Sequence, residues 1–299
     1  MNRLASLALL TILATPAVAA AEATKSHFLT NDALGDGEDR WRSAGFAYYL
    51  GYEGERTNGI PHHFRINTQI ISPQAPTGSS GPDRPYVGMF GVGAFLNHRI
   101  GLTDVTAGGE VAMIGEQTGI SELQNTFHDV FGTDGYMPNE DEGLNQVPDA
   151  ITGMASTEVA MNYYVGQKGL VRPFGGAQYG YETFLRAGVD LMWGEYSYAE
   201  RFVRDPISGF IQPASEYRKT ALEGFSILAG VDYTAVTESD FFPESSGVVM
   251  EPGRLRARLG FQAGFKDVSI FYGLTHLTKE FEGQDEGQTV GTISFQMKL

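Results

Sequence analysis

Four polar residues, Asn31, Asp32, Ser43 and His128, have the types that could carry out a hydrolysis. Asn31 and Asp32 end one strand-like segment, Ser43 begins the next, and His128 follows Gln124 by four residues in a later run. A serine hydroxyl can attack a carbonyl when an imidazole takes its proton. Alternatively, an imidazole can activate water while a carboxylate holds a cation that polarises the carbonyl. The residue types predict hydrolysis and leave both mechanisms open.

Each residue also has an ordinary structural explanation. Asn-Asp pairs favour turns, Ser43 could be a plain strand residue, and His128 could belong to a helix with no chemical role. Function becomes the better interpretation only if the elements that carry these residues bring them to the same end of the fold.

The stretch 117–149, which carries Gln124 and His128, is far longer than the usual connection of about two to six residues. Within it, residues 121–132 form an amphipathic run that Ser121 can cap. Long ordered loops on a regular scaffold are commonly functional. We therefore expect a short helix that presents Gln124 and His128 on neighbouring positions of one face.

The N-terminus has the pattern of a secretory signal peptide. Residues 1–3 carry a charge, residues 4–14 are apolar, and small residues follow up to position 21. We predict a signal peptide at 1–21 and one outer-membrane β-barrel domain at 22–299. The chain has no cysteine, so it depends on no disulfide.

The chain is strongly acidic, with a net charge of −15. Removal of residues 1–21 takes away one arginine, which leaves 20 basic and 36 acidic residues and a net charge of −16. A polyanion of this kind does not bind nucleic acid non-specifically. The acidic surplus by itself is most simply a device for solubility.

Alternating apolar and polar residues recur in twelve segments of roughly ten residues after the N-terminal stretch. The segments are Ser26–Asn31, Ser43–Tyr52, His63–Ser72, Tyr86–His98, Leu102–Ile114, Gly153–Gly166, Val171–Gly180, Leu185–Trp193, Leu222–Val236, Arg254–Phe265, Val268–Thr278 and Thr289–Leu299. An even strand number is typical of bacterial outer-membrane barrels, and closure leaves no exposed sheet edge. We predict an all-β fold, a transmembrane antiparallel β-barrel of about twelve strands.

The last segment shows the alternation most clearly. Ile293 and Phe295 fall on one face, whereas Thr292 and Ser294 fall on the other. In a soluble β-sandwich the apolar face would be the core, but in a membrane barrel it would contact lipid. The signal peptide, the even strand count and the chain's end within a strand favour the membrane barrel.

The order of the strands then predicts which connections lie on the same side of the membrane, because successive connections alternate between the two sides. If the N-terminus is periplasmic, the outer connections are 32–42, 73–85, 117–149, 237–253 and 282–288. This arrangement places Asn31, Asp32, Ser43 and His128 on one rim. The segment 195–218 is long yet falls on the inner side, where it is either a periplasmic excursion or a sign of a local error in the strand count.

Four blocks of sequence resemble the outer-membrane lipid A 3′-O-deacylases, which are twelve-stranded barrels of Gram-negative bacteria. The blocks are Thr30-Asn31-Asp32 with Asp39-Arg40-Trp41-Arg42-Ser43-Ala44-Gly45, then Asp83-Arg84-Pro85-Tyr86-Val87-Gly88, Gln124-Asn125-Thr126-Phe127-His128, and Thr278-Lys279-Glu280-Phe281. Each block is short, but their order and placement together are specific, and they extend over most of the mature chain.

The resemblance implies Ca²⁺-dependent hydrolysis of the ester that joins the 3′ acyloxyacyl group to lipid A. It implies that His128 is the general base acting on water and that Asn31 and Asp32 organise the Ca²⁺ and the oxyanion. Ser43 stands where the family has a threonine and keeps the hydroxyl, while Gln124 matches a family glutamine near the base. Asp134 departs from the family pattern, which has a glutamate at that position.

The implied partner is lipid A or lipopolysaccharide in the outer leaflet, with the active site facing that leaflet in a Gram-negative outer membrane. A monomer is expected. Two other hypotheses stay open at this point: a non-enzymatic barrel that serves as a pore or assembly protein, and an outer-membrane phospholipase that uses Ser43 and His128.

Overall fold

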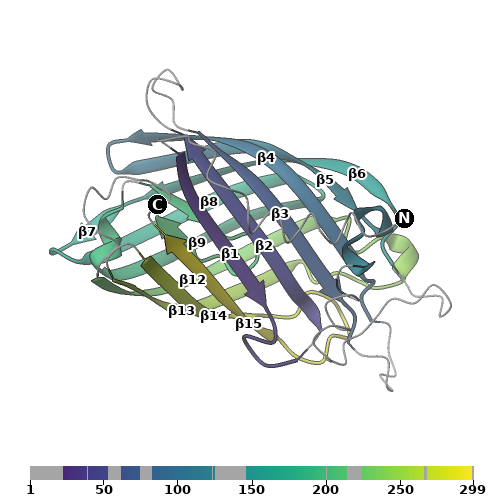
Figure 1. The fold of residues 1–299 in the computed structure, drawn as a ribbon. Helices are drawn as coiled ribbons and strands as arrows, with labels where there is room; N and C mark the ends of the chain where they lie inside the picture. Colours follow the sequence, from purple (N-terminus) through teal and green to yellow (C-terminus); the bar gives the residue numbers. More distant parts are fainter. Residues whose placement is uncertain are drawn as a thin grey trace.

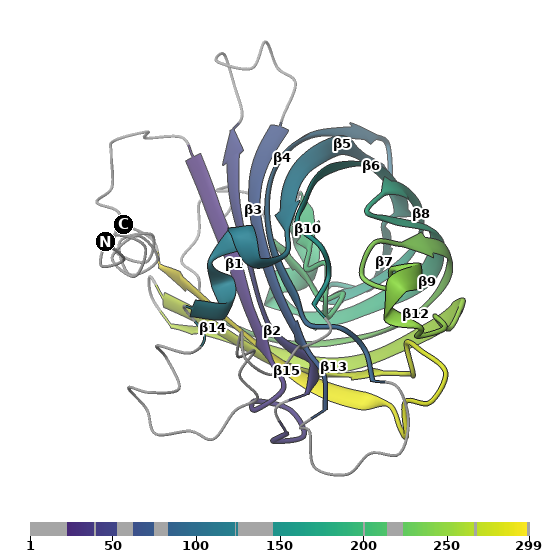
Figure 2. The same ribbon diagram turned by 90° about the vertical axis from the view of Figure 1, so that its right-hand side faces the viewer.

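The long strands form one closed antiparallel sheet in a computed structural model (Figures 1 and 2). The structure describes residues 23–38, 40–52, 62–74, 83–122, 124, 146–199, 201–213, 224–265 and 268–297. The predicted signal peptide lies outside these ranges and stays a prediction.

Twelve strands make up the barrel wall within the described ranges. They are β1 (Ala23–Asn31), β2 (Trp41–Tyr52), β3 (His62–Ser72), β4 (Val87–Ile100), β5 (Thr103–Ile114), β6 (Ala150–Met161), β8 (Gly169–Gly180), β9 (Glu182–Gly194), β12 (Gly224–Ser239), β13 (Gly253–Phe265), β14 (Val268–Leu277) and β15 (Gln288–Met297). The three-residue β7 (Tyr163–Val165) continues β6 and pairs with β8. Since β1 pairs with β15 and β6 pairs with β8, the sheet closes, and the predicted twelve-stranded barrel is confirmed.

The strands alternate between an apolar outer face and an inner face that is largely polar. On β4, Val87 and Met89 are buried inside, whereas Val92 and Leu96 are exposed outside. Ile151 on β6 is 73% exposed. Large apolar side chains exposed along many strands are stable only against lipid. Of the helices among the described residues, none is long and apolar enough to cross a membrane.

The prediction for the last strand is confirmed. On β15, Phe295 is 42% exposed, while Thr292 and Ser294 are buried on the lumen side. The face that sequence alternation assigned to lipid is therefore the outer face of the barrel.

Long connections gather at one end of the barrel, which we call the loop rim. They are the segments 32–40, 73–86, 115–149, 240–252 and 278–287. A sixth connection, between β8 and β9, consists of Tyr181 alone, whereas the strand segments predicted from the sequence left residues 181–184 between them.

Residues 202–213 form a small hairpin inside the barrel, which we call the lumen hairpin (Figure 2). Its strands are β10 (Phe202–Arg204) and β11 (Ile211–Pro213). The twelve-strand count was therefore correct, and the expectation of an excursion away from the barrel is wrong for this described part of 195–218. The chain turns back into the lumen because Arg204 finds buried carboxylates there, Glu158 at 2.7 Å and Asp190 at 2.8 Å.

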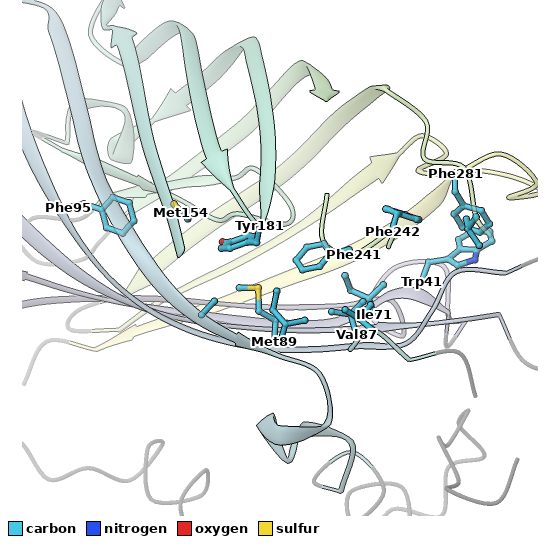
Figure 3. Packing of buried hydrophobic residues seen from close by; sticks show 14 residues of the cluster. Trp41, Ile71, Val87, Met89, Phe95, Met154, Tyr181, Phe241, Phe242 and Phe281 are labelled. Carbon is cyan, nitrogen blue, oxygen red and sulfur yellow. The ribbon is translucent and has the colours of Figure 1, made fainter. Parts of the chain in front are cut away.

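Apolar side chains fill the lumen at the loop rim and form what we call the rim cluster (Figure 3). Its members include Trp41, Ile71, Val87, Met89, Phe95, Met154, Tyr181, Phe241, Phe242 and Phe281. A cavity of about 170 Å³ remains between the rim cluster and the lumen hairpin, and Arg42, Arg65 and Arg254 are among its lining residues. The interior is thus occupied from both ends.

Candidate active site at the loop rim

The β1–β2 connection brings Asn31, Asp32 and Ser43 together. Asn31 and Ala44 form the last register pair of the two strands. The backbone N–H of Asp32 then donates to the carbonyl of Ser43 at 3.2 Å. Thr30, the preceding residue, is buried on the lumen side, so alternation places Asn31 on the outer face. Three of the five residues predicted to act together are therefore neighbours.

The Asp32 carboxylate organises the turn that follows β1. One oxygen accepts the N–H of Ala33 at 2.8 Å, and the other accepts the N–H of Arg40 at 2.8 Å. The side-chain oxygen of Asn31 also accepts the Ala33 N–H at 2.8 Å. These contacts confirm the turn-forming role of the Asn-Asp pair. They also fix the positions of both side chains.

A β-bulge between Trp41 and Ala44 interrupts the strand at Ser43. Arg42 reaches into the lumen, where it donates to Gln69 at 2.7 Å. Alternation counted from Ala44, the register partner of Asn31, would place Ser43 on the lumen side, and the bulge breaks that alternation at Arg42 and Ser43. Trp41 adopts a φ of 54°, a conformation that is strained for a non-glycine residue and that clusters at functional sites.

The hydroxyl of Ser43 is buried and has no hydrogen-bond partner within the described part of the chain. A buried polar group without a partner costs about 1–3 kcal/mol. Native proteins keep such groups mainly where a ligand, water or ion completes them. The Ser43 hydroxyl is therefore one of several buried polar atoms at this end of the barrel, with the Ser72 hydroxyl and Arg84 Nε, that could bind a ligand.

Residues 120–122 and 124 are helical and form the start of the expected loop helix. The helix begins at Ile120, so Ser121 lies in its first turn and the prediction of Ser121 as the cap is wrong. The Thr118 hydroxyl accepts the Ile120 N–H at 3.4 Å instead. His128 and Asp134 lie outside the described residues, and their placement remains a prediction.

The start of this helix lies against the outer face of β4. Tyr86 and Gly88 face outward, since Val87 between them belongs to the rim cluster. The Tyr86 hydroxyl donates to the side-chain oxygen of Gln124 at 2.9 Å. A Cβ at Gly88 would lie only 2.8 Å from the Thr118 hydroxyl, so glycine is what allows the loop to approach the wall. The block 83–88 thus holds Gln124, the first residue of the block 124–128.

The far end of the long loop returns to the same residue. Gln146 forms a β-bridge with Tyr86, and the Val147 N–H donates to the Tyr86 carbonyl at 3.0 Å. Gln124 itself is not brought against Asn31, because β4 lies three strand spacings from β1, about 14 Å along the wall.

Glu280 joins the remaining blocks of sequence. Its carboxylate forms ion pairs with Arg84 and with Arg42, the latter at 2.9 Å, and Arg254 lies at 3.6 Å. Next to it, the rings of Trp41 and Phe281 meet edge to face at 6.5 Å. The four separated blocks are therefore connected, the first and second through Glu280 and the second and third through Tyr86.

Electrostatics at Glu280 follow from this packing. Burial opposes ionisation of the carboxyl, but the three guanidinium groups outweigh burial and hold the pKa of Glu280 well below its usual value. Burial also lowers the pKa of Arg84 to about 10. Both groups are charged at neutral pH and depend on each other. The sequence offered only one signal for Tyr86, Arg84 and Glu280, their membership of the recognised blocks.

The family described as "Outer membrane protein LpxR" matches residues 4–299. The chain belongs to the LpxR family. The structure of LpxR from Salmonella typhimurium has the same fold, with a TM-score of 0.72, 18% identity and coverage of 92% of this chain and 100% of that chain. None of the curated proteins matches the sequence.

Two other outer-membrane barrels are more distant. The β domain of the Bordetella autotransporter BrkA has a TM-score of 0.47 and 10% identity over 93% of this chain and 100% of that chain. The KdgM porin has a TM-score of 0.43 and 6% identity over 93% and 99%. The predicted family is confirmed, and as an LpxR-type barrel the chain is a protein of the Gram-negative outer membrane.

Proposed function

We propose that this LpxR-family barrel is a Ca²⁺-dependent esterase that removes the 3′-acyloxyacyl chain of lipid A, with the loop rim facing the outer leaflet. Family membership supports the reaction class. The observation that carries the proposal is the meeting of Asn31, Asp32 and Ser43 at the loop rim, with the Ser43 hydroxyl buried and unpartnered among the described residues.

The position of these residues suits an amphiphilic substrate. Directly below Asn31, the outer face of β1 carries Leu29, which is 40% exposed, and β2 carries the stacked rings of Phe46 and Tyr48. A polar site above an apolar wall lies where the acyl chains of a membrane lipid end and its head group begins. An ester at that boundary reaches the site from the side, without entering the lumen.

The residues fit Ca²⁺ by donor type. The cation prefers oxygen ligands, and the site offers the Asp32 carboxylate, the Asn31 side-chain oxygen and the Ser43 hydroxyl. The Asp32 carboxylate also accepts the N–H groups of Ala33 and Arg40, which hold it in place. No cluster of three or more His, Cys, Asp or Glu occurs among the described residues.

Bound Ca²⁺ would supply positive charge that polarises the ester carbonyl and offsets the repulsion between an anionic lipid and an acidic protein. Asn31 can add a hydrogen bond to the oxyanion, because its oxygen is held by the Ala33 N–H and its amide nitrogen has no partner among the described residues. His128 would take the proton from the attacking water. Gln124, fixed by Tyr86, holds the helical turn that precedes His128 in the sequence.

The direct test is mass spectrometry of lipid A from Gram-negative cells that express the protein. Wild type should release the 3′ chain, His128→Ala should not, and His98→Ala, which alters an exposed histidine of β4, should behave as wild type. Lipid A left unchanged by the wild-type protein would refute the proposal. Activity that survives EGTA but is lost in Ser43→Ala would instead indicate a serine phospholipase.

The pore hypothesis is disfavoured by the contents of the lumen. The lumen hairpin occupies one part of the barrel and the rim cluster fills the other, with a cavity of only about 170 Å³ between them. A pore needs a continuous aqueous path.

A further inference from the structure

The tip of the lumen hairpin lies against the inner side of the wall that carries the candidate site. The Thr30 hydroxyl donates to the Asp205 carboxylate at 3.1 Å. A Cβ at Gly45 would collide with the Cδ1 of Ile207. Thr30 and Gly45 are register partners, and the next pair along is Asn31 with Ala44. The tip therefore contacts the last inward-facing pair before the site.

The tip is fixed by several strands besides β1 and β2. The Asp205 carboxylate accepts the N–H of Ser208 at 2.7 Å, which closes the turn. Arg256 of β13 donates to the carbonyl of Ile207 at 2.8 Å, and the Thr275 hydroxyl of β14 donates to that of Ser208 at 3.1 Å. Together these contacts hold the tip in one position.

Arg204, the last residue of β10 beside the tip, is bound to the opposite wall. Arg204 pairs with Glu158 of β6 and Asp190 of β9, while its own carbonyl accepts the Tyr49 hydroxyl of β2 at 2.5 Å. The hairpin thus spans the lumen from β6 and β9 to β1 and β2. It is built as a brace with its free end under Asn31 and Ser43.

We propose that this brace sets the position of Asn31 and Ser43, so that Ile207 and Asp205 are positioning residues for the hydrolysis; the proposal rests on the function proposed above. Gly45 has no side chain, so Ile207 supplies the packing behind this part of the wall. A displacement of about 1 Å in reacting groups can lower a rate by about 100-fold. Loss of the packing atoms of Ile207 should therefore lower the rate of hydrolysis before it lowers the stability of the fold.

Two variants of the same hairpin separate positioning from simple filling of the lumen. Ile207→Ala removes the side chain under Gly45, whereas Val203→Ala removes a buried side chain from β10, in the body of the hairpin. With purified, folded protein in detergent and lipid A as substrate, Ile207→Ala should lower kcat by about 10-fold or more at unchanged KM. Val203→Ala should stay within about twofold of wild type, and Ile207→Leu should restore most of the rate.

Motion near the site can be measured independently of the reaction. Because the chain has no cysteine, a single introduced cysteine can be labelled specifically. A spin label on Ala33→Cys, an exposed position next to Asp32, reports motion of the turn after β1. The label should become more mobile when Ile207→Ala is added and should not change when Val203→Ala is added. A residue that merely stabilised the barrel would not produce this difference.

Equal losses of kcat in the two alanine variants, or no loss in either, would overturn the proposal. If the wild-type protein releases no acyl chain at all, the function proposed above fails. The mobility of the spin label then tests the positioning of the site residues by itself. Greater mobility in Ile207→Ala alone then upholds the positioning of the site residues by the hairpin, and unchanged mobility overturns it.

Discussion

Glu280→Gln is predicted to be among the most damaging single substitutions at the loop rim. Arg84 has a fully buried side chain, and Glu280 is its only acidic ion-pair partner within the described ranges. Arg42 and Arg254 also lose a partner but keep Glu182, at 4.0 and 3.0 Å. Removal of one member of a buried ion pair leaves a buried charge uncompensated and costs about 3–5 kcal/mol. We expect a loss of that size in the free energy of unfolding.

The matched control is Glu286→Gln. Glu286 pairs with Arg40 at 2.8 Å, but its side chain is 65% exposed. Exposed ion pairs contribute about 0–1 kcal/mol. The two variants make the same chemical change at a buried and at an exposed position. The difference between their free energies of unfolding therefore measures how much the buried position of Glu280 contributes.

Urea unfolding of the protein in lipid vesicles, followed by tryptophan fluorescence, gives the measurement. The chain has two tryptophans: Trp41 lies beside Phe281 in the rim cluster, and Trp193 is exposed on β9 near the opposite end. Equal destabilisation by Glu280→Gln and Glu286→Gln would refute the reasoning. A second check is the pair Glu280→Gln with Arg84→Met, which should recover part of the loss because the unpaired charge is gone.

The same residue predicts a dependence on pH. The folded pKa of Glu280 lies below its unfolded value of about 4.3. Its contribution is therefore complete above about pH 4.3 and is lost as the pH falls toward the depressed folded pKa. Stability of the wild type should decline through that window, and Glu280→Gln should show a shallower decline.

Three further predictions concern the site and the lumen. Tyr86→Phe removes the donor to buried Gln124, a change worth about 1–3 kcal/mol; it should slow acyl release at least severalfold, whereas Tyr179→Phe, at an exposed residue of β8, should not. Asp32→Asn keeps the shape of the turn but removes the charge, so acyl release should require more Ca²⁺ or cease. The wild-type barrel in a planar bilayer should show no steady ion conductance, and porin-like currents would contradict the filled lumen.

The barrel could be predicted from the sequence because alternation is a local signal that repeats in every strand. The strand predicted at Thr289–Leu299 is β15 almost to the residue at its start. The connection at Tyr181 was predicted too long, because the polar residues Glu182 and Thr183 read as loop although they begin β9. The lumen hairpin could not be predicted, because strands of three residues carry no periodic pattern. The strand count gives only the end of the barrel at which a segment begins and ends, not the path between.

The candidate site was predictable in part. Antiparallel pairing of the first two segments already implies that Asn31 and Ser43 are neighbours. Strict alternation from Gly45 and Ala47, however, would place Ser43 in the lumen. The bulge at Trp41–Ala44 interrupts that alternation, and no local pattern announces a bulge. Contacts such as Arg84 with Glu280 join residues 196 positions apart and depend on closure of the whole barrel.

The double attachment at Tyr86 has a consequence for engineering. Gln124 and Gln146 are both tied to this residue, so the chain between them is a loop whose ends are already joined. The entropic cost of such a loop rises only with the logarithm of its length, by about 0.6 kcal/mol for each doubling. A tag or reporter peptide inserted shortly before Gln146 would therefore leave the base of the helix unchanged. Natural variation in loop length could accumulate there for the same reason.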